Sequence, residues 1–229
     1  MGAAELTVQD WDGYAARWTA MHGGSDPRWS SPPARAWMWL AYGCARPLAR
    51  FSVPASALTT FGLLCCVGAP ALLLLGPVWA LAAAGLVGLA AFAETLDSAV
   101  AVISGRITPL GTVYHAVAAR LAEACWLAAL WLAGVPAWLA AGCCAVAWLH
   151  EYARTESTLS GMSPARMVTM AEHRMRFAAS VVGLALAGLA TRLSPELAVG
   201  SATVAATVWL LLGIGGLIQL ADSVQHSLR

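Results

Sequence analysis

The sequence predicts an all-α membrane protein with six transmembrane helices and an N-terminal amphipathic helix at the membrane interface. Hydrophobic residues make up 59% of the chain and charged residues only 11%, whereas a soluble domain has about 25% charged residues. A membrane-spanning helix needs roughly 20 mostly apolar residues. Six segments meet this requirement: 53–75, 78–103, 109–134, 136–158, 173–192 and 197–221. The formal net charge of +1 gives no indication of a nucleic-acid partner.

The distribution of basic residues predicts how these helices are oriented. The connections GPVW and GVPAW carry no charge, whereas the other connections hold most of the arginines. With the N-terminus in the cytoplasm, all of the 13 basic residues except Arg120 and Arg192 lie on the cytoplasmic side. This bias is the one that sets topology in membrane proteins. We therefore expect a multi-pass protein of the plasma membrane with both termini in the cytoplasm.

Residues 1–50 are expected to form cytoplasmic or interfacial helices ahead of a six-helix membrane domain, residues 51–229. Trp11, Tyr14 and Trp18 recur three or four residues apart, which places them on one face of a helix. That helix either lies on the membrane surface or packs on the protein's own cytoplasmic face. A second helix near residues 34–48 carries aromatic residues suited to the membrane interface. These are Trp37, Trp39 and Tyr42.

Ionisable residues interrupt the second and third expected spans. Glu94 and Asp97 are three residues apart and share one helix face at the cytoplasmic end of the second span. His115, Ala119 and Glu123 are spaced by four and share a face of the third. The short link between the spans predicts an antiparallel hairpin in which the two faces oppose each other. A charge at membrane depth costs about 2.5–3.5 kcal/mol, so such groups usually pair or line a polar cavity.

Two interpretations of these charges follow from the residues alone. In the first, Glu94, Asp97, Arg120 and Glu123 form a buried ion-pair network that fixes helix packing. In the second, they line a functional site. The intervals between the residues favour the second: Glu94-x2-Asp97-Ser98-x2-Ala101-Val102-x8-Gly111-x3-His115-x3-Ala119.

This pattern resembles the signature of the CDP-alcohol phosphotransferases, D-x2-D-G-x2-A-R-x8-G-x3-D-x3-D. Every interval agrees, and Asp97, Ala101 and Gly111 keep the residue of the family. Glu94 replaces the first aspartate with another carboxylate. Arg120 and Glu123 also resemble what commonly follows the motif, and we expect them to form a structural ion pair.

A second stretch extends the resemblance. YARTESTLSG followed by AEHRMR is similar to the family's cytoplasmic region after the fourth span, where arginines hold the phosphate of the acceptor. The resemblance implies acceptor or phosphate binding by Arg154, Arg174 and Arg176, with His173 standing where an arginine is usual. A basic loop that only anchors the chain on the cytoplasmic side is the alternative.

The resemblance implies an activity and a set of site residues. Family members use aspartates to hold two divalent cations, which bind the pyrophosphate of a CDP-linked donor, and the last aspartate deprotonates the attacking alcohol. The implied function is a CDP-alcohol phosphatidyltransferase of phospholipid biosynthesis that uses CDP-diacylglycerol, releases CMP and forms homodimers or heterodimers with a homologue. The implied metal ligands are Glu94, Asp97 and His115. The implied donor-binding residues are Ser98, Ala101 and Gly111.

Four departures from the motif weaken that chemistry. Ala119 cannot transfer a proton, and losing a general base typically costs about 10²–10⁴ in rate. Val102 replaces an arginine, Ser98 replaces a glycine, and His115 favours Zn²⁺ or Mn²⁺ over Mg²⁺. Two carboxylates balance about one Mg²⁺ or Mn²⁺ ion rather than two.

Three hypotheses remain, and no confident catalytic residue is predicted. The chain is a transferase with weak or rebuilt activity, in which His115 or a substrate phosphate acts as the base. In the second hypothesis, the chain is a non-catalytic membrane protein that binds membrane lipid or pairs with an active homologue. A structural or transport protein is the third hypothesis, and it leaves the matching intervals unexplained.

Overall fold

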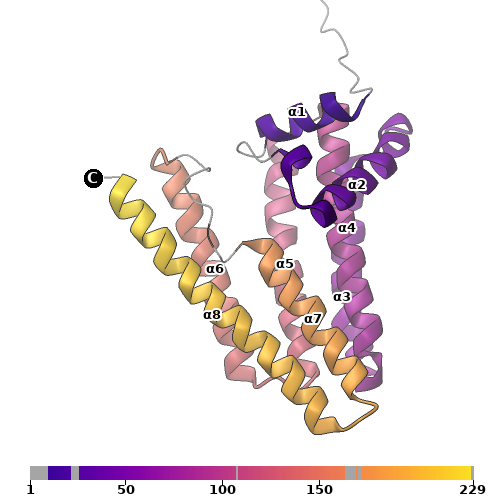
Figure 1. The fold of residues 1–229 in the computed structure, drawn as a ribbon, viewed down its shortest axis with the longest axis vertical. Coiled ribbons are helices and arrows are strands. Elements are labelled where there is room, and N and C mark those ends of the chain that lie inside the picture. The colour runs from indigo at the N-terminus through magenta and orange to yellow at the C-terminus, as the bar shows by residue number, and fades with distance from the viewer. Residues whose placement is uncertain (1–9, 22–25, 107, 163–168, 170–171, 228–229) are drawn as a thin grey trace, which may run out of the picture. The chain divides into compact units, whose positions relative to one another are not determined.

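The computed structural model describes residues 10–21, 26–106, 108–162, 169 and 172–227 (Figure 1). Over these residues the chain forms eight α-helices and two short 3-10 helices, without a strand. The α-helices are α1 (Trp11–Met21), α2 (Pro32–Arg50), α3 (Ala55–Leu74), α4 (Ala80–Ser104), α5 (Pro109–Leu132), α6 (Ala137–Leu159), α7 (His173–Ala190) and α8 (Pro195–Ser227). The 3-10 helices are η1 (Pro27–Trp29) and η2 (Pro77–Trp79). The predicted all-α class is confirmed for this part of the chain.

Three helical segments of the described residues are long and apolar enough to cross a membrane, which indicates a membrane protein. They are Ala55–Leu74, Pro77–Ser104 and Pro195–Ser227, and they coincide with the first, second and sixth expected spans. α5, α6 and α7 have 24, 23 and 18 residues, which is long enough to span a bilayer. Polar groups such as Arg120, Glu123 and Glu151 lower the mean hydropathy of these three helices. Six spans therefore stay a prediction.

The chain divides into two compact units. The first contains the described residues up to Gly62 together with Ala91–Ala118, and the second contains Leu63–Ala90 and the described residues from Ala119 onward. Both chain termini and Arg166, which enter the topology prediction, lie outside the described residues. The expected boundary between residues 50 and 51 concerns placement in the membrane and stays a prediction.

An aromatic core holds the first unit together. Tyr14 and Trp18 of α1 are buried against Tyr42 of α2, with 5.0 Å between the ring centroids of Tyr14 and Tyr42. Ala99, Val100 and Val102 of α4 complete this core. The aromatic face of α1 therefore packs on the protein's own helices, as the second of the two interpretations predicts. An interfacial amphipathic α1 is not confirmed.

Small residues bring the helices of the second unit close together. A Cβ atom added to Gly188 of α7 would lie 2.5 Å from the backbone nitrogen of Leu81, and one added to Gly183 would lie 2.6 Å from the Cβ of Ala205 in α8. Trp126 and Trp209 are buried in the apolar core of this unit. Close approach through glycine and alanine is typical of helices that pack within a membrane, and it gives the polar groups of α5, α6 and α7 a rigid frame.

Candidate functional site

Three side chains predicted as metal ligands meet in the first unit. Glu94 and Asp97 lie one turn apart on α4, and His115 reaches them from α5, which follows a turn that contains Gly105 in a left-handed conformation. His115 Nδ1 lies 3.0 Å from Asp97 Oδ2, and its Nε2 lies 3.6 Å from Glu94 Oε1. The imidazole thus bridges the two carboxylates, with one ring nitrogen toward each.

A third helix contributes a residue that the sequence reasoning missed. The hydroxyl of Thr59 on α3 donates a hydrogen bond to Asp97 Oδ2, so this oxygen accepts from both Thr59 and His115. The adjacent Thr60 instead shares a 2.8 Å hydrogen bond with the hydroxyl of Tyr114. We call Glu94, Asp97, His115 and Thr59 the Asp97 cluster. Two neighbouring threonines in an apolar span were the only indication in the sequence.

The Asp97 cluster combines a buried carboxylate with accessible partners. The side chains of Glu94 and His115 are 34% and 36% exposed, whereas that of Asp97 is 9% exposed. Carboxylate and hydroxyl oxygens are the donors that hard divalent cations prefer, and two carboxylates suit the charge of one such ion. Within the described residues, however, no group of three or more His, Cys, Asp or Glu side chains stands ready to hold a metal.

The residues expected at the donor site lie near this cluster in sequence and have local roles of their own. Ser98 and Ala101 are half-buried on α4. The backbone amide of Gly111 donates a 3.0 Å hydrogen bond to Thr108 Oγ1, which caps the start of α5. Val102, at the position of the motif arginine, is only 1% exposed and belongs to the aromatic core. Core packing therefore accounts for Val102.

A second polar cluster lies in the second unit around Glu123 of α5. Glu123 is fully buried. Its Oε2 lies 2.8 Å from Arg120 Nη1, and its Oε1 lies 3.0 Å from His173 Nδ1 and 3.3 Å from Arg176 Nε. The structure thus brings Arg120 and Glu123 together as an ion pair, as their spacing of three on a helix predicts.

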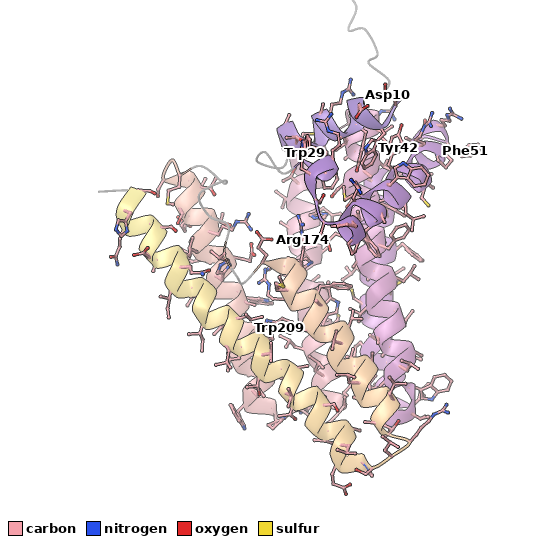
Figure 2. The ribbon with its side chains drawn as sticks, in the orientation of Figure 1. Asp10, Trp29, Tyr42, Phe51, Arg174 and Trp209 are labelled. Atoms are coloured by element: carbon pink, nitrogen blue, oxygen red, sulfur yellow. The ribbon has the colours of Figure 1, made fainter. Side chains whose placement is uncertain are left out.

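Arg176 connects this pair to a second carboxylate. Its Nη2 lies 2.7 Å from Glu151 Oε1, and its Nη1 donates to the carbonyl of Ala147 at 3.3 Å. Arg176 is 2% exposed, so its guanidinium is committed to two carboxylates rather than open to an acceptor phosphate. Of the other two expected phosphate-binding residues, Arg154 is half-buried on α6 and Arg174 is exposed at the start of α7 (Figure 2).

The histidine beside Glu151 completes what we call the Glu123 cluster. His150 is 1% exposed and bonds Thr169 Oγ1 through Nε2 at 2.8 Å. The cluster therefore consists of Arg120, Glu123, His150, Glu151, His173 and Arg176. Its two arginines balance its two glutamates, which is how charges become tolerable in an apolar interior. Glu151 and His150 were missed because their contacts are tertiary: Glu151 pairs with Arg176 of α7, and His150 bonds Thr169, which is 19 residues away.

Comparison with known proteins adds no assignment. No protein-family model matches the chain, and no curated protein matches it.

Proposed function

We propose that the chain is an integral membrane protein of the CDP-alcohol phosphatidyltransferase type, with a metal site reduced to about one divalent cation. The reaction would transfer a phosphatidyl group from CDP-diacylglycerol to an alcohol and release CMP. The observation that carries the proposal is the meeting of Glu94, Asp97 and His115 in one cluster. All three residues occupy positions of the motif, and Asp97 and His115 are 18 residues apart in the sequence.

The residues of the cluster have distinct roles in this proposal. Glu94 and Asp97 would hold a Mg²⁺ or Mn²⁺ ion, which supplies positive charge to the donor pyrophosphate when it is bound. Thr59 keeps the Asp97 carboxylate in one orientation through its hydrogen bond. Ser98, Ala101 and Gly111 remain the candidates for donor contacts. Arg154 and Arg174 remain the candidates for the acceptor, since Arg176 is occupied by Glu123 and Glu151.

The same site supports a slow reaction at best. Ala119 stands where the general base is expected, and the absence of a base typically costs about 10²–10⁴ in rate.

The proposal also includes a membrane topology and an oligomeric state. The chain would cross the membrane six times with both termini in the cytoplasm. The protein would act as a homodimer or as a heterodimer with a homologue.

A second candidate is a non-catalytic protein that binds lipid or pairs with an active homologue. The burial of Val102 favours it, because the position that would carry a cationic donor contact is part of the aromatic core. Catalytic and non-catalytic forms share the fold and differ in whether CMP is released.

The experiment measures CMP release from CDP-diacylglycerol with Mg²⁺ or Mn²⁺ across a panel of acceptors that includes glycerol phosphate and inositol phosphate. We expect slow release by the wild type and none by Asp97→Asn. The combined variant Ser98→Gly, His115→Asp and Ala119→Asp restores the motif and should raise the rate by about 10² or more. Val102 is kept because an arginine there would enter the aromatic core. A folded restored variant that stays inert supports the non-catalytic candidate.

A further inference from the structure

The outer face of α2 exposes large apolar side chains. Trp39 is 63% exposed and Leu40 is 51% exposed. Trp37, in contrast, packs on the Phe92 ring and donates a hydrogen bond to Thr95 of α4. Trp29 before α2 and Phe51 after it are 88% and 83% exposed, at the two ends of the helix (Figure 2). We call Trp29, Trp39, Leu40 and Phe51 the α2 outer surface. Tryptophan is enriched where a membrane meets water.

The opposite face of α2 already supplies the core of the first unit. Ala41, Tyr42 and Ala45 are buried, at the spacing of one helix face. Tyr42 contacts Trp11 and Tyr14 of α1 through its ring. Core packing therefore accounts for one face of the helix, and the α2 outer surface serves another purpose.

α2 carries positive charge without negative charge. Its sequence contains Arg35, Arg46 and Arg50 and neither aspartate nor glutamate. Among the ion pairs of the described residues, none involves these three arginines; Arg46 stacks over the Tyr42 ring at 5.6 Å. Arg28, in contrast, is held by Asp26 at 2.7 Å and by Asp12 at 3.5 Å. The arginines of α2 are thus available to an anionic partner.

The connection to α3 restricts where α2 can lie. α2 ends at Arg50, and α3, which is long and apolar enough to cross a membrane, begins at Ala55. Four linking residues span at most about 14 Å, and Ser52 turns the chain with a φ of 57°. The C-terminal end of α2 is therefore close to a membrane surface, where tryptophan is enriched.

From this combination we infer that the α2 outer surface binds anionic lipid headgroups, with the aromatic side chains at the headgroup level and Arg35, Arg46 and Arg50 against the lipid phosphates. Basic residues beside a transmembrane helix attract anionic lipids. The partner is the bilayer surface itself, so the inference goes beyond the proposed reaction and does not depend on it.

The test compares phosphatidylglycerol with phosphatidylcholine as ligands of the purified full-length protein, using native mass spectrometry to count retained lipids. We expect the wild type to retain phosphatidylglycerol preferentially. Replacing Arg35, Arg46 and Arg50 with glutamine should lower that preference by about fivefold per arginine. The matched control replaces Arg17, Arg106 and Arg192 with glutamine, which removes the same charge at residues that have no role in the proposed site. It should retain most of the preference.

Two outcomes would overturn the inference: no preference for phosphatidylglycerol in the wild type, or an equal loss in both triple variants. If the α2 triple variant does not fold, Arg35→Gln and Arg50→Gln are tested singly, because both side chains are exposed. Asp97→Asn should keep the preference for phosphatidylglycerol. That result separates lipid binding at α2 from donor binding at the Asp97 cluster.

Discussion

The Asp97 cluster and the Glu123 cluster contain similar residues but differ in exposure and in charge balance. In the Asp97 cluster, two carboxylates share the imidazole of His115, and the side chains of Glu94 and His115 are about one-third exposed. In the Glu123 cluster, two carboxylates face two guanidinium groups, and Glu123, His150 and Arg176 are buried.

This difference separates two uses of charge within one chain. Buried ions that neutralise one another fix the helices that carry them, because removing one partner leaves an uncompensated charge. Carboxylates that are accessible and paired with an imidazole can exchange that partner for a ligand. We therefore propose a structural role for the Glu123 cluster and a binding role for the Asp97 cluster.

The largest expected effect is on the stability of the second unit. Glu123→Gln removes the negative charge that contacts Arg120, His173 and Arg176. Breaking a buried ion pair from one side costs about 3–5 kcal/mol, so the midpoint of thermal unfolding in detergent should fall sharply. Arg174→Gln, on the same helix as Arg176 but exposed, is the matched control and should change stability by at most about 0.5 kcal/mol. An unfolding midpoint of Glu123→Gln equal to that of the control would contradict a structural role.

Asp97→Asn is expected to have a smaller effect on stability. It keeps the shape of the side chain and the hydrogen bond from Thr59, so the free energy of unfolding should fall by about 1–2 kcal/mol. The comparison is made by thermal unfolding beside Glu123→Gln under the same conditions. If the two variants lose equal stability, the Asp97 cluster is a packing network as well.

Thr59 and Thr60 offer a matched pair for the orientation of Asp97. Thr59→Val removes the hydrogen bond to Asp97, while Thr60→Val removes the one to Tyr114. Groups that orient a metal ligand typically contribute about 10–100-fold in metal affinity. We expect Thr59→Val to weaken Mn²⁺ binding, measured by electron paramagnetic resonance, by about tenfold. Equal affinities in the two valine variants would show that Thr59 does not support the site.

The smallest effect is expected at a half-buried pair outside both clusters. Side-chain and backbone hydrogen bonds with Arg28 hold the pKa of Asp26 below its ordinary value, which is about 3.9. A pKa that is lower in the folded state stabilises the fold above the ordinary value, and this contribution is lost as the pH falls through the folded-state value. Asp26→Asn should therefore lower the unfolding midpoint slightly at neutral pH. The difference from the wild type should disappear as the pH falls through the lowered pKa of the folded state.

The helical class and the Asp97 cluster could be predicted because both depend on local periodicity. Apolar segments of about 20 residues indicate helices, and the spacing of Glu94 and Asp97 places both on one face. An antiparallel hairpin then brings His115 opposite them. None of these steps requires knowledge of distant contacts.

Other features could not be predicted because they depend on tertiary packing. A threonine in an apolar helix commonly bonds the carbonyl one turn earlier, as Thr59 also does with Ala55, so its contact with Asp97 leaves no trace in the sequence. The aromatic face of α1 has the same spacing whether it meets lipid or protein. From the sequence alone, Arg176 resembles a phosphate-binding arginine. Its pairing with Glu123 and Glu151 is visible only in the folded structure.

The most direct test of the division between the clusters is binding of CDP-diacylglycerol to purified protein with and without Mg²⁺ or Mn²⁺. It requires no choice of acceptor. We predict metal-dependent binding by the wild type, loss of that binding in Asp97→Asn, and an unfolding midpoint of Asp97→Asn well above that of Glu123→Gln. Metal-independent binding that Asp97→Asn leaves unchanged, or no binding by folded wild-type protein, would contradict a binding role for the Asp97 cluster.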